Sequence, residues 1–166
     1  LRISSELLGE SDQDPFRPAD VAEPVDPFVV DHLVDHRRAE RLRDLDLAWI
    51  EEPLPADDVD GHIRLSRSTS TPIAVGESLY SIRHFREYMQ KGACNIVQVD
   101  VGRIGGITPW LKVAHAAEAF DIPVCPHFLM ELHVSLACAV PNGKYVEYIP
   151  QLDDLTGKHM KIVDGY

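Results

Sequence analysis

The feature that most constrains this chain is a repeat of short apolar runs, each ending in one acidic or imidazole side chain. A stretch with helical spacing follows each run before the next one begins. The polar residues that end the runs are separated by 26, 23, 27 and 20 residues and are Glu51, Glu77, Asp100, His127 and Glu147. A strand, a helix and two loops need about that length, so the spacing predicts five β/α units.

Each unit can be assigned a predicted strand and helix. The predicted strands are residues 47–50, 73–75, 96–99, 122–125 and 145–147, and the predicted helices are 59–68, 81–91, 107–120 and 132–140. Parallel strands of a β/α barrel all open their following loops on one face. The fold class expected is therefore α/β, a partial TIM-type barrel whose five strand-end side chains meet at one rim.

The chain length agrees with part of a barrel. At 166 residues it suits one domain, whereas a complete eight-unit barrel typically needs about 250. No run of 18 apolar residues and no basic segment followed by an apolar one is found, which predicts neither a membrane span nor a secretion signal. Three cysteines, an odd number, are typical of reduced thiols, and the expected location is the cytoplasm.

Charge and pattern both change near residue 45. Residues 1–60 contain 17 acidic and 6 basic residues, whereas residues 61–166 contain 10 of each. The acidic excess disfavours a nucleic-acid partner. Residues 1–27 are proline-rich and predicted to be irregular. A helix is predicted from about residue 28. His32 and His36 share a face of that helix, which is better explained as a solvated face than as a metal site. Residues 1–44 and 45–166 are therefore treated as separate segments.

The strand-end residues suggest a specific chemistry. Glu51 and Glu77 offer the hard oxygen ligands that suit Mg²⁺, although either could instead cap a helix. Asp100 beside His127 has the form of an oriented base, because a carboxylate fixes the imidazole tautomer and leaves the other nitrogen free to take a proton. Glu147 is flanked by apolar and aromatic residues, so it is expected to stay protonated and to donate a hydrogen bond to an oxyanion.

The glycines that follow Asp100 have two readings. Gly102, Gly105 and Gly106 suit a tight strand-to-helix turn, and a phosphate cradle is the functional alternative. The dinucleotide-binding glycine fingerprint is not matched. Turn geometry is therefore favoured.

Five motifs in order resemble the enolase superfamily. They are WIEEP at 49–53, GES at 76–78, D-x-x-x-I-G-G at 100–106, PH followed by Glu131 at 126–131, and Val146-Glu147. The resemblance covers residues 45–166 and is closest to the mandelate-racemase branch. Within that branch the segments GGITPWLK and PHFLMELHVSLA are more similar to the sugar-acid dehydratases.

The resemblance implies roles for the strand-end residues. In the family Mg²⁺ is held by three acidic residues, of which the second and third match Glu51 and Glu77. Asp100 stands where the muconate-lactonizing branch places a lysine base, which implies a mandelate-racemase type. His127 would remove the proton α to a small carboxylate substrate, an acid sugar for a dehydratase, and then protonate the departing β-hydroxyl. Glu147 would be the protonated glutamate that stabilises the enediolate.

Two family motifs have no counterpart. The first metal ligand lies in D-x-N and a K-x-K pair lies one strand earlier, yet residues 1–94 contain no asparagine and residues 1–90 no lysine. The capping domain and the first three barrel strands are missing as well, so the five units match strands four to eight. We therefore expect a truncated or frame-shifted piece that is inactive alone and binds Mg²⁺ weakly.

Other functions remain open at this point. A non-catalytic remnant could persist as an interaction partner that docks through open strand edges, and a homo-oligomer like those of the family is a further expectation. A Schiff-base aldolase is disfavoured because no strand end carries a lysine. Glu52, Arg103, Glu131 and His133 could line or support the pocket, with surface or helix-start roles as the alternative.

Overall fold

The computed structural model describes residues 45–149 and 160–163. The strands are β1 (Ile50–Glu51), β2 (Ile73–Val75) and β3 (Ile96–Val97), and the helices are α2 (Val59–Ser68), α3 (Ile82–Lys91), α4 (Ile107–Glu118) and α5 (Met130–Cys138). Strands and helices alternate from β1 to α4, as predicted, and the α/β architecture is confirmed. The strand predicted at 122–125 is reduced to bridges at Val124, so α5 follows α4 directly. The irregular segment 1–27, the helix from residue 28, and His32 and His36 lie outside the described residues.

The strands form one parallel sheet in the order β1-β2-β3. Ile50 is opposite Ile73 in the first pair, and Val75 is opposite Val97 in the second. Parallel bridges from Val97 to Val124 and from Val124 to Gly143 carry the same order on through two more segments. Five segments of the described chain therefore follow one another across the sheet, one for each predicted unit.

The last segment pairs earlier than predicted. The Lys144 N–H donates to the Val124 carbonyl at 3.0 Å, and the Val124 N–H donates to the Asn142 carbonyl at 2.8 Å. No strand forms at the predicted residues 145–147. The Asn142 side chain sets this register, since its amide donates at 3.0 Å to the carbonyls of Ala114 and Ile122. The predicted strand at 47–50 likewise begins only at Ile50.

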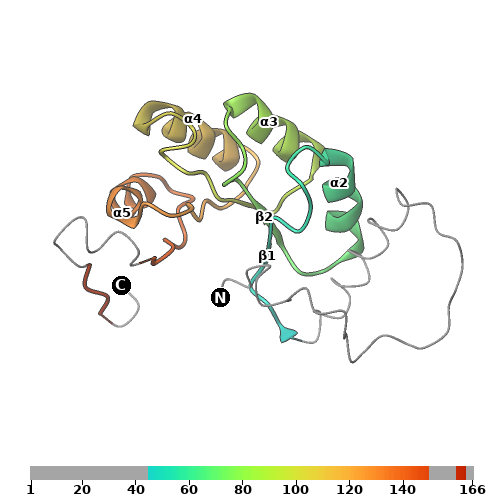
Figure 1. The fold of residues 1–166 in the computed structure, drawn as a ribbon, viewed down its shortest axis with the longest axis horizontal. Coiled ribbons are helices and arrows are strands. Elements are labelled where there is room, and N and C mark those ends of the chain that lie inside the picture. The colour runs from blue at the N-terminus through green and yellow to red at the C-terminus, as the bar shows by residue number, and fades with distance from the viewer. Residues whose placement is uncertain (1–44, 150–159, 164–166) are drawn as a thin grey trace, which may run out of the picture.

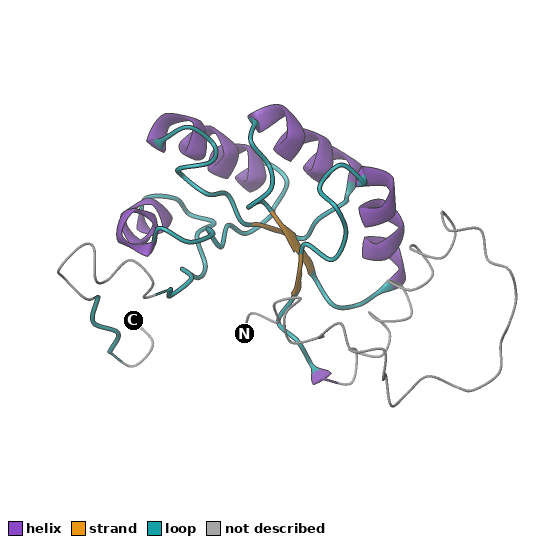
Figure 2. Ribbon diagram, viewed as in Figure 1, coloured by secondary structure: helices purple, strands orange, loops and turns teal. Residues whose placement is uncertain are grey.

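The four helices lie in an arc outside the strands (Figure 1), and the short strands occupy the inside of that arc (Figure 2). The core between them is apolar and includes the fully buried side chains of Phe85, Trp110, Val113 and Val124. Such helices are stable because one face is apolar while the termini are capped. In α3, the Ser81 side chain accepts from the His84 N–H, and Gly92 ends the helix in the left-handed conformation at φ 65°.

No helix in the described part of the chain is both long and apolar enough to cross a membrane.

Candidate active site

The imidazole of His127 lies between two carboxylates from neighbouring strand ends. Its Nδ1 is 2.9 Å from Asp100 Oδ2, and its Nε2 is 2.8 Å from Glu77 Oε2. The side chains of Asp100 and His127 are 4% and 7% exposed, whereas that of Glu77 is 23% exposed. We call these three residues the rim cluster. An imidazole donates to both carboxylates at once only when it carries two protons.

Asp100 is held as a hydrogen-bond acceptor by the turn that follows it. Its Oδ1 accepts from the backbone N–H of Gly102 at 2.7 Å and of Arg103 at 3.1 Å. Burial by itself raises the pKa of Asp100, but the hydrogen bonds from His127, Arg103 and Gly102 outweigh it, and the pKa is lowered overall. An ionised Asp100 can therefore fix the orientation of the His127 ring.

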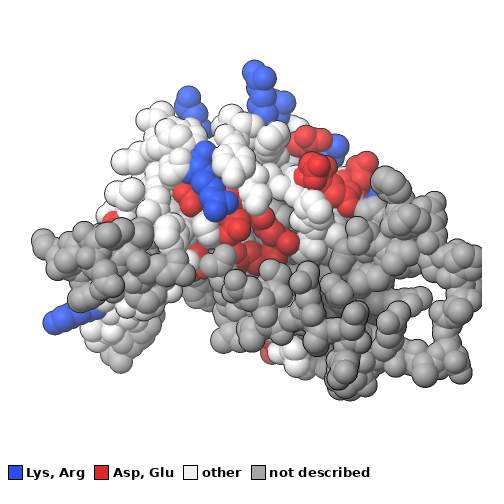
Figure 3. Space-filling model, viewed as in Figure 1, with Lys and Arg blue, Asp and Glu red and all other residues white. Residues whose placement is uncertain are grey.

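Arg103 connects two members of the rim cluster from outside. Its Nη1 donates to the Glu77 carbonyl at 2.6 Å, and its Nε is 3.9 Å from Asp100 Oδ2. Its side chain is 39% exposed, so the charge stays partly solvated. On the face seen in Figure 3, acidic side chains gather near the middle with basic side chains beside them.

Glu52 anchors the loop that carries Glu77. Its carboxylate accepts from the backbone N–H of Gly76 at 3.2 Å and of Ser78 at 2.9 Å, and from the Ser78 hydroxyl at 2.5 Å. Gly76 is required here because a Cβ at this position would lie 2.4 Å from the Gln98 carbonyl carbon. The support role considered for Glu52 in the sequence thus takes the form of a loop anchor.

The other two strand-end residues, Glu51 and Glu147, line one cavity of about 510 Å³, and we call them the wall carboxyls. Glu51 Oε2 accepts from Gln98 Nε2 at 3.0 Å, and Glu147 Oε2 accepts from the Phe128 N–H at 2.8 Å. The remaining lining is largely apolar or aromatic and includes Trp49, Pro126, Tyr145, Val146 and Tyr148. The protonated state expected of Glu147 stays a prediction, since both forms of a carboxyl can accept this bond.

The five predicted residues therefore form two adjoining groups. Three of them are in direct contact at the rim, and two share the cavity. The groups are joined through the backbone, because Phe128 follows His127 directly and Gln98 lies two residues before Asp100.

Sequence reasoning missed Gln98 and misplaced His133. Gln98 shares the strand alternation of Asp100, which was an available signal that it faces the site. His133 was considered as a pocket-lining residue, but it is 0% exposed and is absent from the cavity lining. Glu131, considered with it, lies in the first turn of α5 and is exposed.

The donor chemistry of Glu51 and Glu77 suits a hard cation such as Mg²⁺. Within residues 45–149 and 160–163, however, no three His, Cys, Asp or Glu side chains are arranged to hold a metal ion. The described residues supply two carboxylates of the kind required. The assignment of Glu51 and Glu77 as Mg²⁺ ligands therefore stays a prediction.

Comparison with known proteins identifies the relatives. Residues 30–166 match the enolase C-terminal domain-like family. The L-talarate/galactarate dehydratase of Salmonella typhimurium is 37% identical over 129 residues, which cover 78% of this chain and 32% of the relative. The chain thus spans about a third of the length of this relative.

Solved structures agree with the sequence match. The L-talarate dehydratase from Polaromonas sp. JS666, in complex with Mg and L-glucarate, is 40% identical with a TM-score of 0.77, covering 81% of this chain and 37% of that one. A mandelate racemase/muconate lactonizing enzyme from the same organism gives the same identity, coverage and score. The resemblance drawn from the five motifs is confirmed, and the chain belongs to the enolase C-terminal domain-like family, whose members similar to it include sugar-acid dehydratases.

Proposed function

We propose that this chain carries the proton-abstraction machinery of a Mg²⁺-dependent acid-sugar dehydratase or mandelate-type racemase. The observation that carries the proposal is the contact of His127 with Asp100 at one ring nitrogen and Glu77 at the other. Asp100 orients a base in this geometry, and the opposite nitrogen faces the carboxylate expected to bind metal. The relatives that act on acid sugars support the substrate class.

The roles follow from the contacts. Asp100 accepts the Nδ1 proton of His127, so Nε2 takes the proton α to the substrate carboxylate. The electron pair of the broken C–H bond moves into the carboxylate as an enediolate, to which Glu147 donates a hydrogen bond when it is protonated. In a dehydration, His127 returns a proton to the β-hydroxyl, which leaves as water, and the remaining enol rearranges to a 2-keto acid. In a racemisation, the proton returns to the α-carbon.

Glu51 and Glu77 are the residues that would hold Mg²⁺. Bound there, the ion would supply positive charge against the enediolate. Glu77 Oε2 contacts His127 Nε2, so the imidazole and a cation would compete for this oxygen. Loss of the His127 contact by Glu77 would leave Nε2 available as the base.

The proposed setting follows from the same reading. We propose a cytoplasmic protein that acts on a small carboxylate, without a nucleic-acid or membrane partner. A homo-oligomer is proposed from the family resemblance.

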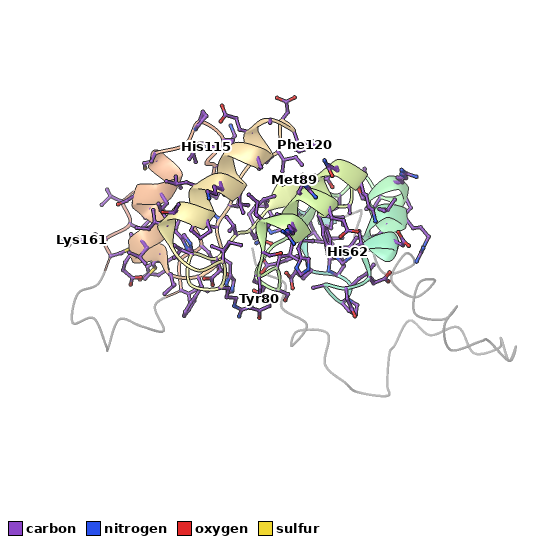
Figure 4. All side chains as sticks on the ribbon, turned by 90° about the horizontal axis from the view of Figure 1, so that it is seen from above. His62, Tyr80, Met89, His115, Phe120 and Lys161 are labelled. Carbon is purple, nitrogen blue, oxygen red and sulfur yellow. The ribbon has the colours of Figure 1, made fainter. Side chains whose placement is uncertain are left out.

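Isotope exchange tests the catalytic proposal. Because this chain alone is expected to be inactive, the full-length enzyme reconstructed around it is incubated in heavy water with millimolar Mg²⁺ and galactarate, L-talarate or D-galactonate. The α-proton signal is followed by NMR alongside 2-keto product. Exchange that disappears in His127→Asn but persists in His115→Asn, a change on α4 (Figure 4), is the expected result. Without exchange on any acid sugar in the reconstructed enzyme, the catalytic proposal is refuted.

A second candidate is a non-catalytic interaction partner. Within the described residues, β1 pairs only with β2, so one edge of the sheet ends at Ile50 and Glu51. Open strand edges can accept a strand from another chain. Co-elution of this chain with an intact homologue in size-exclusion chromatography, together with absence of exchange, would favour this function.

A further inference from the structure

The buried ring of His133 joins the two loops that carry Asp100 and His127. Its Nε2 is 3.1 Å from the backbone N of Val101, and its Nδ1 is 3.0 Å from the carbonyl oxygen of Phe128. Val101 follows Asp100 directly, and Phe128 follows His127 directly. A single ring on α5 therefore contacts the backbone of the residues that follow Asp100 and His127.

The two partners determine the proton arrangement of the His133 ring. A backbone N–H can only donate, so Nε2 must be an unprotonated acceptor toward Val101. A carbonyl oxygen can only accept, so Nδ1 must carry the proton toward Phe128. Burial lowers the pKa of His133, partly opposed by its bond to the Phe128 carbonyl, which agrees with a neutral ring.

Phe128 is held through both its backbone N–H and its backbone carbonyl. Its N–H donates to Glu147 Oε2 at 2.8 Å, and its carbonyl accepts from His133. Its φ of 59° is in the left-handed region, which costs a bulky residue energy and needs support from the surroundings. His133 and Glu147 provide that support, so the loop after His127 is over-determined by two side chains.

Trp110 packs against the His133 ring. The ring centroids are 6.1 Å apart, and the Trp110 indole N–H donates to the Val99 carbonyl at 3.1 Å. Val99 precedes Asp100 directly. Both residues that flank Asp100 in the chain are thus bonded to this pair of buried rings.

We propose that His133 is a positioning residue, which sets the spacing of Asp100 and His127 by bridging the Val101 N–H and the Phe128 carbonyl. It deepens the proposed function, because the pair that it holds is the proposed base and its orienting carboxylate. His133 does not itself line the cavity, so it acts through those residues. A phenylalanine could fill the same volume but could not bridge the loops.

Histidine NMR on the full chain tests this without requiring turnover. The chain is labelled with ¹⁵N-histidine, and long-range ¹H–¹⁵N spectra report the tautomer of His133 and the His127 Nδ1 proton shared with Asp100. We expect a neutral Nδ1–H tautomer at His133. In His133→Phe the His127 Nδ1 proton should exchange with solvent about tenfold faster or more, whereas His133→Gln, which keeps a donor and an acceptor, should restore part of the protection.

Leu136→Ala is the matched control, because Leu136 is a buried residue of the same helix without a polar link to the site. It should lower the melting temperature while keeping the His127 signal. An unchanged exchange rate in His133→Phe, or equal loss in Leu136→Ala, would overturn the proposal. If His133→Phe does not fold, two other results would overturn the proposal. One is an Nε2–H tautomer of His133 in the unmodified chain. The other is equal protection of the His127 Nδ1 proton from exchange in His133→Gln and in His133→Leu, whose side chain cannot form the bridge.

Discussion

The rim cluster and the wall carboxyls are built from the same kinds of strand end but are held differently. At the rim, Asp100 and Glu77 face opposite nitrogens of His127. At the wall, Glu51 and Glu147 accept from neutral amide groups, the Gln98 side chain and the Phe128 backbone. The rim geometry therefore depends on the protonation of an imidazole, whereas the wall geometry depends on strand register and loop conformation.

The difference has an energetic consequence. Groups buried in a low dielectric interact strongly, and removing one partner leaves the others uncompensated. Asp100 and His127 are nearly inaccessible to water, whereas Glu51 and Glu147 are partly exposed beside a cavity that water can enter. Substitutions at the rim should thus cost more than matched substitutions at the wall.

The largest effect is expected from removing the imidazole. His127→Ala leaves Asp100 and Glu77 without their common partner, and the free energy of unfolding should fall by about 2–3 kcal/mol. Glu147→Gln at the wall keeps an acceptor for the Phe128 N–H and should cost about 1 kcal/mol or less. Urea unfolding measures the loss of unfolding free energy in each variant. Equal losses would contradict the expected difference between the rim and the wall.

Metal binding should involve both groups. We expect the unmodified chain to bind Mg²⁺ weakly, in the millimolar range, and Glu51→Gln or Glu77→Gln to weaken it further by about tenfold. Isothermal titration calorimetry gives the affinities, and Gln90→Ala on α3 is an exposed control. Micromolar affinity in the unmodified chain would contradict a two-carboxylate site.

Protonation of Asp100 at acid pH should lower the free energy of unfolding. Its folded pKa lies below the usual value of 3.8, so ionised Asp100 stabilises the fold above that pH, and the contribution is lost as pH falls through the folded pKa. Asp100→Asn should flatten the dependence of the unfolding free energy on pH below about 4. Denaturant unfolding at several acid pH values measures it, and an unchanged slope would show that Asp100 is not the responsible group.

The smallest effect concerns a buried histidine outside both groups. His62 on α2 (Figure 4) contacts the Asp58 carbonyl at 2.9 Å and the Tyr88 hydroxyl at 3.2 Å. Burial lowers its pKa despite the opposing effect of Asp58. The unfolded chain then binds more protons below its usual pKa of 6.5, so stability falls as pH drops below that value, by at most about 1.4 kcal/mol per pH unit.

His62→Gln tests this contribution. It should reduce the slope of unfolding free energy against pH between about 6.5 and 5. Because His62 has no carboxylate at either ring nitrogen among the contacts described, the comparison separates the effect of burial from that of paired charge. A slope equal to that of the unmodified chain would exclude His62 as its source.

Much of the fold follows from local patterns. Helix α2 has the predicted bounds, and α3 begins within one residue of its prediction, because apolar spacing and capping residues are local signals. The strand at 73–75 also matches. The final strand was misplaced because its pairing is decided by Asn142, whose bonds to Ala114 and Ile122 are long-range and leave no periodic signal.

The sequence by itself determined the β/α order, the position of Glu51, Glu77, Asp100 and His127 at or just after paired segments of the sheet, and the family, since these depend on spacing and on motifs along the chain. Only the tertiary structure decided that Glu77 contacts His127, that Glu51 and Glu147 face a shared cavity, and that His133 is buried behind the site. The physical reason is that spacing places a residue at a strand end, whereas its partners depend on side-chain rotamers and on loops from distant segments meeting across the rim.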